Sequence, residues 1–516
     1  MENLLQTETL IIELLVVASL VAIVAQRIKL PYTVALVLVG FALTLFGSTR
    51  FDLTKDLILA IFLPPLLFEA AFHVDFQALR RSLKTILLLA IVGVLISAFI
   101  VGGLVSSFTT LSFVGALLFG TLIVATDPVA VTALFSSLGA PKQLSTIVEG
   151  ESLYNDGAAI VLFNIVLGVA LTGEFSLATG LLEFAWVSLG GIGIGLGLGW
   201  LAAQLIARVD NYLIETTITA ALAFGAYLVG EEIHVSGVLA VVAAGILNGN
   251  FGTRGMSAST KIVLFNFWEY VAFLANSLIF LLIGLEVEFS LLSQHFMAIL
   301  IGFAAVMVAR VIVIYGLGHF LNTLGIDEGL SLPYQHVLTW GGLRGAVSLA
   351  LALGLPFSLG ETREMILAMT FGVVLIMLLA QATTMEWLLK RLGLVGRPNL
   401  EVEYELQRGK LLTARAARRQ LEEMHDRGEL SAKTWETLQD EVSTAEQTAY
   451  QELQELVQTH SDLEALELES TRRELLFTRR AELSKLRRTG LLEEEAFDQL
   501  AEKYDRALHE LSNPEP

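Results

Sequence analysis

Long apolar runs separated by short polar loops dominate this sequence and limit the folds open to it. A run of about 20 apolar residues is long enough to cross a bilayer as a helix. The chain is 54% hydrophobic and 16% charged, with a mean hydropathy of +0.66, whereas soluble domains carry about 25% charged residues. The sequence therefore predicts an all-α polytopic membrane protein.

Thirteen apolar segments are candidate transmembrane helices. Several are shorter than the ~20 residues of a straight crossing, so neighbouring helices must cover their ends. The N-terminal sequence M-E-N-L-L-Q-T-E-T-L lacks the positive region of a cleavable signal peptide, so the first segment is expected to stay. The segments lie near residues 8–26, 31–47, 53–73, 84–107, 111–138, 143–171, 176–207, 213–231, 235–250, 261–287, 291–320, 334–355 and 364–390.

The loop charges predict an orientation in the membrane. Basic residues follow segments 1, 3, 5, 7, 9 and 13, so the positive-inside rule places the N-terminus outside and the C-terminal tail in the cytoplasm. Only the loop after segment 11, with Asp327 and Glu328, does not support this. The basic loops carry Arg27, Lys29, Arg80, Arg81, Lys84, Lys142, Arg208, Arg254, Lys261, Lys390, Arg391 and Arg397; the opposite loops carry Asp52, Lys55, Asp56, Glu174, Glu231, Glu232, Glu286, Glu288, Glu361, Arg363 and Glu364. We expect a prokaryotic plasma (inner) membrane.

Two of the segments are interrupted. Segment 5 contains Thr126, Asp127 and Pro128, and segment 12 contains W-G-G-L-R-G (Trp340 to Gly345). One interruption in each half of a transporter is typical of broken helices in an inverted repeat, where the breaks cross near the bilayer midplane and frame the binding site. Segments 1–6 and 8–13 would be the two six-helix repeats, with segment 7 as the linker.

The chain divides into a transmembrane domain, residues 1–397, and an acidic tail, residues 398–516. From residue 401 onward there are 27 acidic and 16 basic residues and no basic patch, so nucleic acid is not an expected partner. The stretches 428–438 and 490–500 resemble each other: a glycine would end one helix, and Ser431 or Glu493 begins the next. These are either helical hairpins that bind each other or a regulatory partner, or a solvated stalk.

Ionisable residues inside apolar segments are functional candidates, because each costs ~2.5–3.5 kcal/mol at the bilayer centre. Five acids and two bases cannot all pair internally, so some acids must bind protons or metal cations. The charged residues are Glu69, Asp127, Glu149, Glu151, Asp156, Arg310 and Arg344, and the neutral polar ones are Asn155, Asn164 and Asn276.

The sequence E-S-L-Y-N-D, residues 151 to 156, places polar groups on adjacent helix faces. Ser152 and Asp156 are spaced i, i+4, as are Glu151 and Asn155. Hard oxygen ligands suit a small alkali cation, and Thr126 adds a hydroxyl and a free carbonyl at the helix break. When the cation leaves, burial favours the protonated carboxyl group. One carboxyl group that takes either Na⁺ or H⁺ is sufficient for an exchanger.

Each candidate also has a structural interpretation. Asp156 could be a permanently protonated acid, Asp127 could cap the broken helix, Glu151 could be the buried partner of Arg344, and Glu149 could be a solvated entrance residue. The glycines of residues 190–199 favour close helix packing over a dinucleotide loop. Three histidines near segment ends are either pH sensors or plain interfacial residues: His73, His234 and His336.

The motifs A-T-D-P-V-A-V, E-G-E-S-L-Y-N-D-G and G-G-L-R-G-A-V together resemble those of the NhaP-type sodium/proton antiporters, the prokaryotic relatives of animal sodium/proton exchangers. The likeness covers roughly residues 8–395. It implies a thirteen-helix antiporter fold, usually a homodimer, in which a six-helix core domain moves against an interface domain.

The resemblance also implies residue roles. Asp156 would be the main carboxylate for the ion and the proton, with Ser152 and Thr126 as further ligands. Asn155 stands where the electrogenic branch has a second aspartate, so a one-to-one, electroneutral exchange is implied. Further family positions are Asp127 at the helix crossover, Glu69 near the ion, Glu151 and Arg344 as a buried ion pair, and Arg310 as an additional arginine.

The sequence therefore predicts exchange of Na⁺, or Li⁺, for H⁺ by alternating access, without a cofactor and without enzymatic catalysis. The absence of cysteine excludes thiol chemistry and cysteine-based metal sites. A K⁺/H⁺ antiporter of the same fold is the closest alternative, and a pH-gated cation channel is a more distant one. The tail would be the site of regulation, by a partner that the sequence does not identify.

Overall fold

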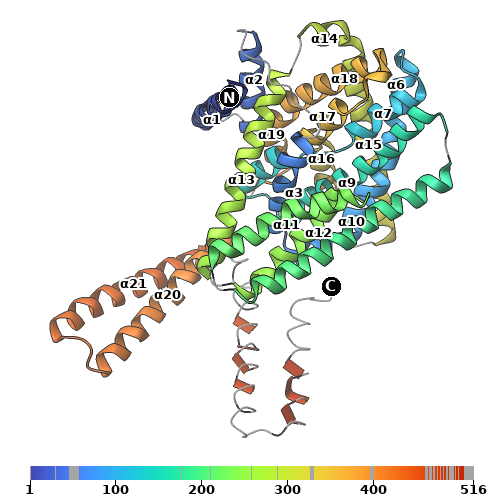
Figure 1. The fold of residues 1–516 in the computed structure, drawn as a ribbon. Coiled ribbons are helices and arrows are strands. Elements are labelled where there is room, and N and C mark those ends of the chain that lie inside the picture. Colours follow the sequence, from blue (N-terminus) through green and yellow to red (C-terminus); the bar gives the residue numbers. More distant parts are fainter. Residues whose placement is uncertain are drawn as a thin grey trace. The chain divides into compact units, whose positions relative to one another are not determined.

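The computed structural model describes residues 2–28, 31–45, 57–174, 176–209, 211–256, 258–286, 289–325, 330–395 and 400–459, and scattered residues between 463 and 504. The chain forms two compact units, Met1–Val395 and Gly396–Pro516. All regular elements in the described ranges are helices (Figure 1). Among the loop residues that predict the orientation, those outside the described ranges are Lys29, Asp52, Lys55, Asp56, Glu288, Asp327, Glu328 and Arg397.

Seven helical stretches of the first unit are long and apolar enough to cross a membrane. Five are regular: α9 (Lys142–Thr172), α10 (Leu177–Ile206), α11 (Tyr212–Glu232), α13 (Ala258–Leu285) and α15 (Phe296–Leu324). Two contain a π-helical turn, in the order α5 (Leu83–Leu87), η2 (Leu88–Gly93), α6 (Val94–Phe108), and α18 (Glu361–Met377), η5 (Leu378–Ala382), α19 (Thr383–Arg391).

The remaining apolar helices have shorter apolar stretches, which in α1 run only from Ile12 to Ala25, and each predicted segment contains a helix. They are α1 (Glu2–Ile28), α2 (Tyr32–Leu45), η1 (Leu57–Phe62) with α3 (Leu63–His73), α7 (Phe113–Ile123), α8 (Val129–Leu138), α12 (Gly237–Asn250), α16 (Leu332–Trp340) and α17 (Ala346–Leu353). The connecting helices α4 (Phe76–Arg81) and α14 (Phe289–Gln294) have six residues each. Helix α9 contacts α3, α7, α12 and α17 and so lies inside the unit.

The two predicted helix interruptions are confirmed, and they touch each other. Residues 124–128 separate α7 from α8, and residues 341–345 separate α16 from α17. The Asp127 backbone N–H donates to the Leu343 carbonyl oxygen at 2.9 Å. A Cβ atom on Gly345 would lie 2.1 Å from Asp127 Oδ2, so glycine is required for this approach. A backbone N–H in the first break is thus satisfied by a carbonyl oxygen in the second.

The glycines between residues 190 and 199 bring α10 against α12, as the packing interpretation predicts. Added Cβ atoms would lie 2.4 Å from the Ser236 carbonyl oxygen at Gly191 and 2.1 Å from that of Ala240 at Gly195. Glycine on one helix therefore allows direct backbone approach between the two helices.

The second unit contains a helical hairpin, α20 (Leu400–Asp426) and α21 (Ala432–Thr459). Gly428, with φ +71°, ends the first helix, and the Ser431 hydroxyl accepts from the Thr434 N–H at 3.3 Å at the start of the second. This is the turn predicted for residues 428–438. Most of the second copy, 490–500, lies outside the described residues; of it, Phe497 packs with Leu483 and Ala501.

Candidate functional site

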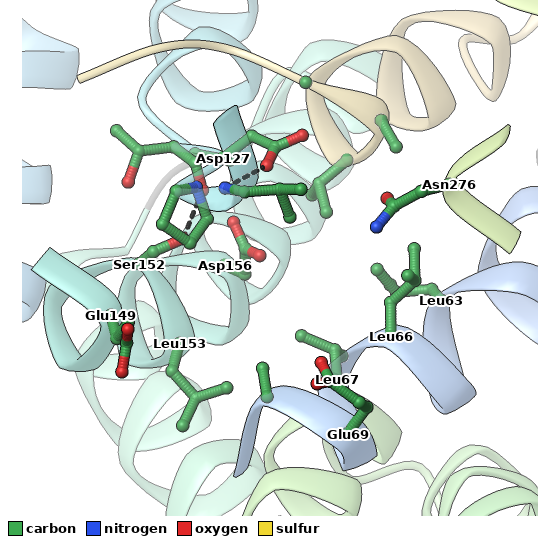
Figure 2. Close-up of a pocket in the computed structure, with 18 of the residues that line it drawn as sticks. Leu63, Leu66, Leu67, Glu69, Asp127, Glu149, Ser152, Leu153, Asp156 and Asn276 are labelled. Atoms are coloured by element: carbon green, nitrogen blue, oxygen red, sulfur yellow. Dashed lines mark hydrogen bonds between the residues drawn. The ribbon is translucent and has the colours of Figure 1, made fainter. Parts of the chain in front are cut away.

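A cavity of about 90 Å³ lies where α3, α9 and the two helix breaks meet. Figure 2 shows Asp127, Ser152 and Asp156 on one side of it, and Asn276 from α13 with Leu63, Leu66 and Leu67 from α3 on the other. Its walls are mainly apolar, and the volume accommodates only a few water-sized groups. The polar lining residues are Glu69, Thr126, Asp127, Glu149, Ser152, Asp156 and Asn276.

Asp156 is a buried carboxylate that lines this cavity and has an oxygen without a hydrogen-bond partner. It is 7% exposed, and its Oδ1 atom has no hydrogen-bond partner in the structure. An ionised carboxylate in such a place carries a large desolvation cost unless something compensates the charge. Asp156 therefore needs a proton or a cation.

Thr126, in the first break, is clamped against α9 beside Asp156. The Asn155 side chain uses both ends of its amide: Oδ1 accepts from the Thr126 N–H at 3.2 Å, and Nδ2 donates to Thr126 Oγ1 at 2.7 Å. The Ser152 hydroxyl donates to the Thr126 carbonyl oxygen. Because the Ser152 hydroxyl donates its proton to that bond, the lone pairs of Ser152 Oγ remain free to bind a cation.

Asp127 has a different environment from Asp156, although both line the cavity. Asp127 Oδ1 accepts from the Val129 N–H at 3.0 Å, at the first turn of α8. A carboxylate at a helix N-terminus is stabilised by the orphan N–H groups and the helix dipole. Asp127 thus has the capping contact of the structural interpretation and is also a lining residue of the cavity.

Glu151 forms a buried ion pair, but its partner is Arg310 and not Arg344. Arg310 Nη2 donates to Glu151 Oε2 at 2.8 Å, and Nη1 donates to Oε1. The predicted Glu151–Arg344 pair is therefore wrong: Arg344 Nη1 donates to the Gly342 carbonyl oxygen at 2.9 Å, and its buried Nε atom has no partner. Among the described residues no carboxylate forms an ion pair with Arg344.

The last turn of α16 explains why Arg310 is the partner. The Leu338 carbonyl oxygen lies near the helix end and accepts from both Nε and Nη2 of Arg310, at 3.1 and 2.9 Å. Such carbonyls lack a partner within the helix. Arg310 on α15 is held there, and its outer nitrogens face Glu151 on α9 in a two-pronged pair.

The other predicted polar residues fall into two groups. Glu69, Glu149 and Asn276 line the cavity, and Glu69 Oε1 lies 3.2 Å from Nδ1 of His73, one turn along α3. Asn164 is exposed, so it does not contribute. His234 has a positive φ of 58° after α11, and His336 contacts the Tyr315 hydroxyl.

Sequence reasoning missed several fully buried polar residues, among them the acid Glu215 and the amides Asn248 and Gln381. Glu215 could have been found from the sequence, because it follows the helix-capping residue Asn211 by four positions. In the structure Asn211 caps α11, and the backbone N–H of Asn211 donates to Glu215 Oε1 at 3.1 Å. Asn248 Nδ2 donates to the Gly199 carbonyl oxygen at 3.0 Å, which links α12 to α10. None of the three lines the cavity.

The described residues contain no cluster of three or more His, Asp or Glu side chains arranged to hold a metal ion. The oxygens around Asp156 instead combine its carboxylate and that of Asp127 with hydroxyl and backbone oxygens. Few charged ligands and small, hard oxygen donors are typical of a site for a monovalent alkali cation.

Comparisons with known proteins identify the fold and the relatives. A family model described as "Sodium/hydrogen exchanger, transmembrane" matches residues 15–391. The chain is 44% identical over 399 residues to the Na(+)/H(+) antiporter ApNhaP of Aphanothece halophytica, covering 77% of this chain and 76% of that one. It is 36% identical over 509 residues to the Na(+)/H(+) antiporter NhaS2 of Synechocystis, covering 98% and 92%.

A solved structure shares the fold. The sodium proton antiporter MjNhaP1 from Methanocaldococcus jannaschii, at pH 8, matches with a TM-score of 0.63 and 24% sequence identity. The match covers 76% of this chain and 99% of that one.

Proposed function

Because the chain belongs to the sodium/hydrogen exchanger family, a family of transporters and not of enzymes, we propose that it exchanges Na⁺, or Li⁺, for H⁺ across the membrane. The chain is a multi-pass membrane protein of the MjNhaP1-like fold. The observation that carries the proposal is that buried Asp156 has an unpartnered Oδ1 atom and lines a small cavity together with further oxygen donors.

Asp156, Ser152 and Thr126 would hold the cation. The Asp156 carboxylate supplies the negative charge, Ser152 Oγ supplies a lone pair, and Thr126 supplies its hydroxyl or carbonyl oxygen from the helix break. Asp127 and Glu69 line the same cavity and add negative charge near the ion. Asn155 positions Thr126 through two hydrogen bonds and stays neutral.

Sodium and the proton compete for Asp156 because both neutralise the same buried carboxylate. Asn155 has no charge, and the Asp127 carboxylate is compensated by the α8 N-terminus. One exchanging carboxylate gives one proton per sodium ion, which makes the cycle electroneutral.

The exchange requires alternating access. A bare, charged Asp156 is costly to move through a dry region, so the loaded forms cross and the empty form does not. Short helices that end inside the membrane give the site backbone groups as well as side chains, as in other transporters with broken helices.

The arrangement in the membrane is part of the proposal. We place thirteen crossings in the membrane: two inverted six-helix repeats and one linker helix between them. The N-terminus lies outside, and the tail of residues 398–516 lies in the cytoplasm of a prokaryotic cell as a regulatory segment. Two copies of the chain form a homodimer. The chain has no cysteine, so single cysteines introduced at Glu174 or Gly428 can be labelled with an impermeant reagent. Labelling of intact cells at position 174 and not at 428 is expected; the reverse pattern would invert the orientation. Native mass spectrometry tests the dimer.

Transport itself is tested with purified protein in sealed vesicles that contain a pH dye and an imposed pH gradient. NaCl and then KCl are added, with and without a voltage clamp set by valinomycin and K⁺. Dye recovery with Na⁺ that does not change under the clamp supports electroneutral Na⁺/H⁺ exchange. Equal or stronger recovery with K⁺ would favour a K⁺/H⁺ antiporter, and a current without coupled proton movement would indicate a channel.

A further inference from the structure

Glu149 is a second carboxylate on the α9 face that carries Asp156. Residues 149, 153 and 156 are spaced i, i+4 and i+7, so they lie on one side of the helix. All three line the cavity. Seven residues of α-helix separate the two acids by roughly 10 Å along the axis, which is too far for one ion to be shared.

The Glu149 carboxylate has no hydrogen bond and no ion pair with any other described residue. It is partly exposed, whereas Asp156 is buried. Across the cavity the nearest charged groups belong to α3, namely Glu69 and its neighbour His73 (Figure 2 shows Glu69 and Glu149 in the same cavity). Of the two acids, Glu149 is thus the more accessible to solvent.

Leu153 lies between these two acids. It is buried, follows Glu149 by one turn and precedes Asp156 by just under one turn. Leu66 and Leu67 face the cavity from α3. A cation that moves from Glu149 to Asp156 must pass these apolar side chains, which cannot replace the water that it loses. The unpartnered Oδ1 atom of Asp156 is the ligand that compensates that loss.

We propose that Glu149 is a staging site: it holds a hydrated monovalent cation at the mouth of the cavity before the ion passes Leu153 to Asp156. Negative charge at the opening of a cavity with low-dielectric walls concentrates cations locally. The proposal rests on the exchange function and on Asp156 as its ion site. It adds a residue whose effect is on cation capture and not on the translocation step.

The experiment measures Na⁺-dependent proton movement in vesicles at fixed pH and low ionic strength. Glu149→Gln is expected to raise the apparent KM for Na⁺ about 3- to 10-fold and to leave the maximal rate unchanged, because local enrichment of the ion is lost. Glu149→Asp, which keeps the charge, should retain the KM of the unmodified protein. Glu183→Gln, which removes a charge from the exposed side of α10, is the matched control and should have no effect.

Ionic strength provides a second readout that a structural role would not change. Choline chloride screens exposed charges, so it should raise the KM of the unmodified protein towards that of Glu149→Gln, whose own KM should barely respond. If Glu149→Gln cannot be purified, Glu149→Ser, which also removes the charge, can take its place in this comparison.

Three results would overturn the staging site. The first is an unchanged KM in Glu149→Gln, and the second is a KM of the unmodified protein that does not respond to choline chloride. The third is complete loss of exchange in a well-folded Glu149→Gln protein, which would place Glu149 in the transport step. Failure of the exchange function itself looks different, because then the unmodified protein moves no protons with Na⁺.

Discussion

Glu151 and Asp156 are five residues apart on one helix, and both are buried, yet they have opposite surroundings. Both Glu151 oxygens accept from Arg310, which also binds the α16 carbonyl of Leu338. Asp156 keeps an oxygen without a partner, beside a cavity. The first carboxylate joins three helices; the second is left open for a ligand.

This difference shows that burial alone does not identify a transport carboxylate. In a buried ion pair whose carboxylate oxygens both accept hydrogen bonds from the partner, no oxygen remains free to bind an ion. The net contribution of such a pair to stability is often small. A buried carboxylate with an unpartnered oxygen carries an uncompensated desolvation cost, which binding of a proton or a cation can remove. We therefore infer a transport role for Asp156, which has an unpartnered oxygen, and a structural role for Glu151, whose oxygens both bind Arg310.

The largest expected effect comes from Asp156→Asn. The amide can neither release a proton nor supply charge to a cation, so exchange should fall to the level of empty vesicles. The protein should still fold and melt at or above the temperature of the unmodified protein, because a neutral group replaces a buried charge. Dye-loaded vesicles and a thermal melt measure the two quantities. Exchange at the normal rate by a folded variant would contradict the assignment.

Breaking the complete pair should mainly destabilise the fold. Glu151→Gln or Arg310→Gln leaves one buried charge without its partner, at an expected cost of about 3–5 kcal/mol. The double variant should lose less than the sum of the two. Unfolding of the purified protein, followed by fluorescence, gives these values.

Arg344→Gln separates the structural assignment from the sequence prediction. Arg344 pairs with no described carboxylate, so its replacement should cost less than that of Arg310 and should be additive with Glu151→Gln. Strong coupling of Glu151 to Arg344, with none to Arg310, would restore the predicted pair and contradict the structure.

Asn155→Ala should have an intermediate effect, on ion affinity. It removes both hydrogen bonds that clamp Thr126 and leaves a buried N–H group unpaired, a loss of about 1–3 kcal/mol. A KM for Na⁺ raised about tenfold is expected, since 1.4 kcal/mol corresponds to one factor of ten. Asn164→Ala, at an exposed position of the same helix, is the control. Equal KM values for the two variants would remove Asn155 from the site.

The smallest effect is expected in the tail hairpin. Glu446 pairs with Arg415 at 3.2 Å and with Arg418 at 3.1 Å, but both arginines are about half exposed. Such pairs contribute roughly 0–1 kcal/mol, so Glu446→Gln should barely change amide-exchange protection of α20 in the full chain. Leu453→Ala, which removes a buried side chain, should reduce that protection clearly. The opposite ranking would show that charge holds the hairpin together.

The predictable parts of the fold are those that depend on residues close together in the sequence. Proline disrupts the helix in which it stands, and paired glycines allow the backbone of another segment to approach closely. The sequences T-D-P and W-G-G-L-R-G therefore predict where the two helices are interrupted. The glycine spacing of α10 and the Gly428–Ser431 turn follow the same logic. Helical spacing alone also placed Ser152 and Asp156 on one face of α9.

The partner of Glu151 was not predictable in this way. Both Arg310 and Arg344 lie in apolar segments, and nothing in their spacing from Glu151 ranks them. The choice depends on the carbonyl of Leu338 at the end of α16, which binds Arg310 in three dimensions. The orphan oxygen of Asp156 is likewise a tertiary property, because it depends on what the surrounding helices leave unfilled.

The most direct test of the central claim is the number of protons released when Na⁺ binds to the purified protein in weakly buffered detergent solution. If one carboxylate takes either ion, sodium binding must displace protons from it. We expect close to one proton per sodium ion bound by the unmodified protein, and neither binding nor release by Asp156→Asn. Proton release by Asp156→Asn equal to that of the unmodified protein would show that another group carries the exchange.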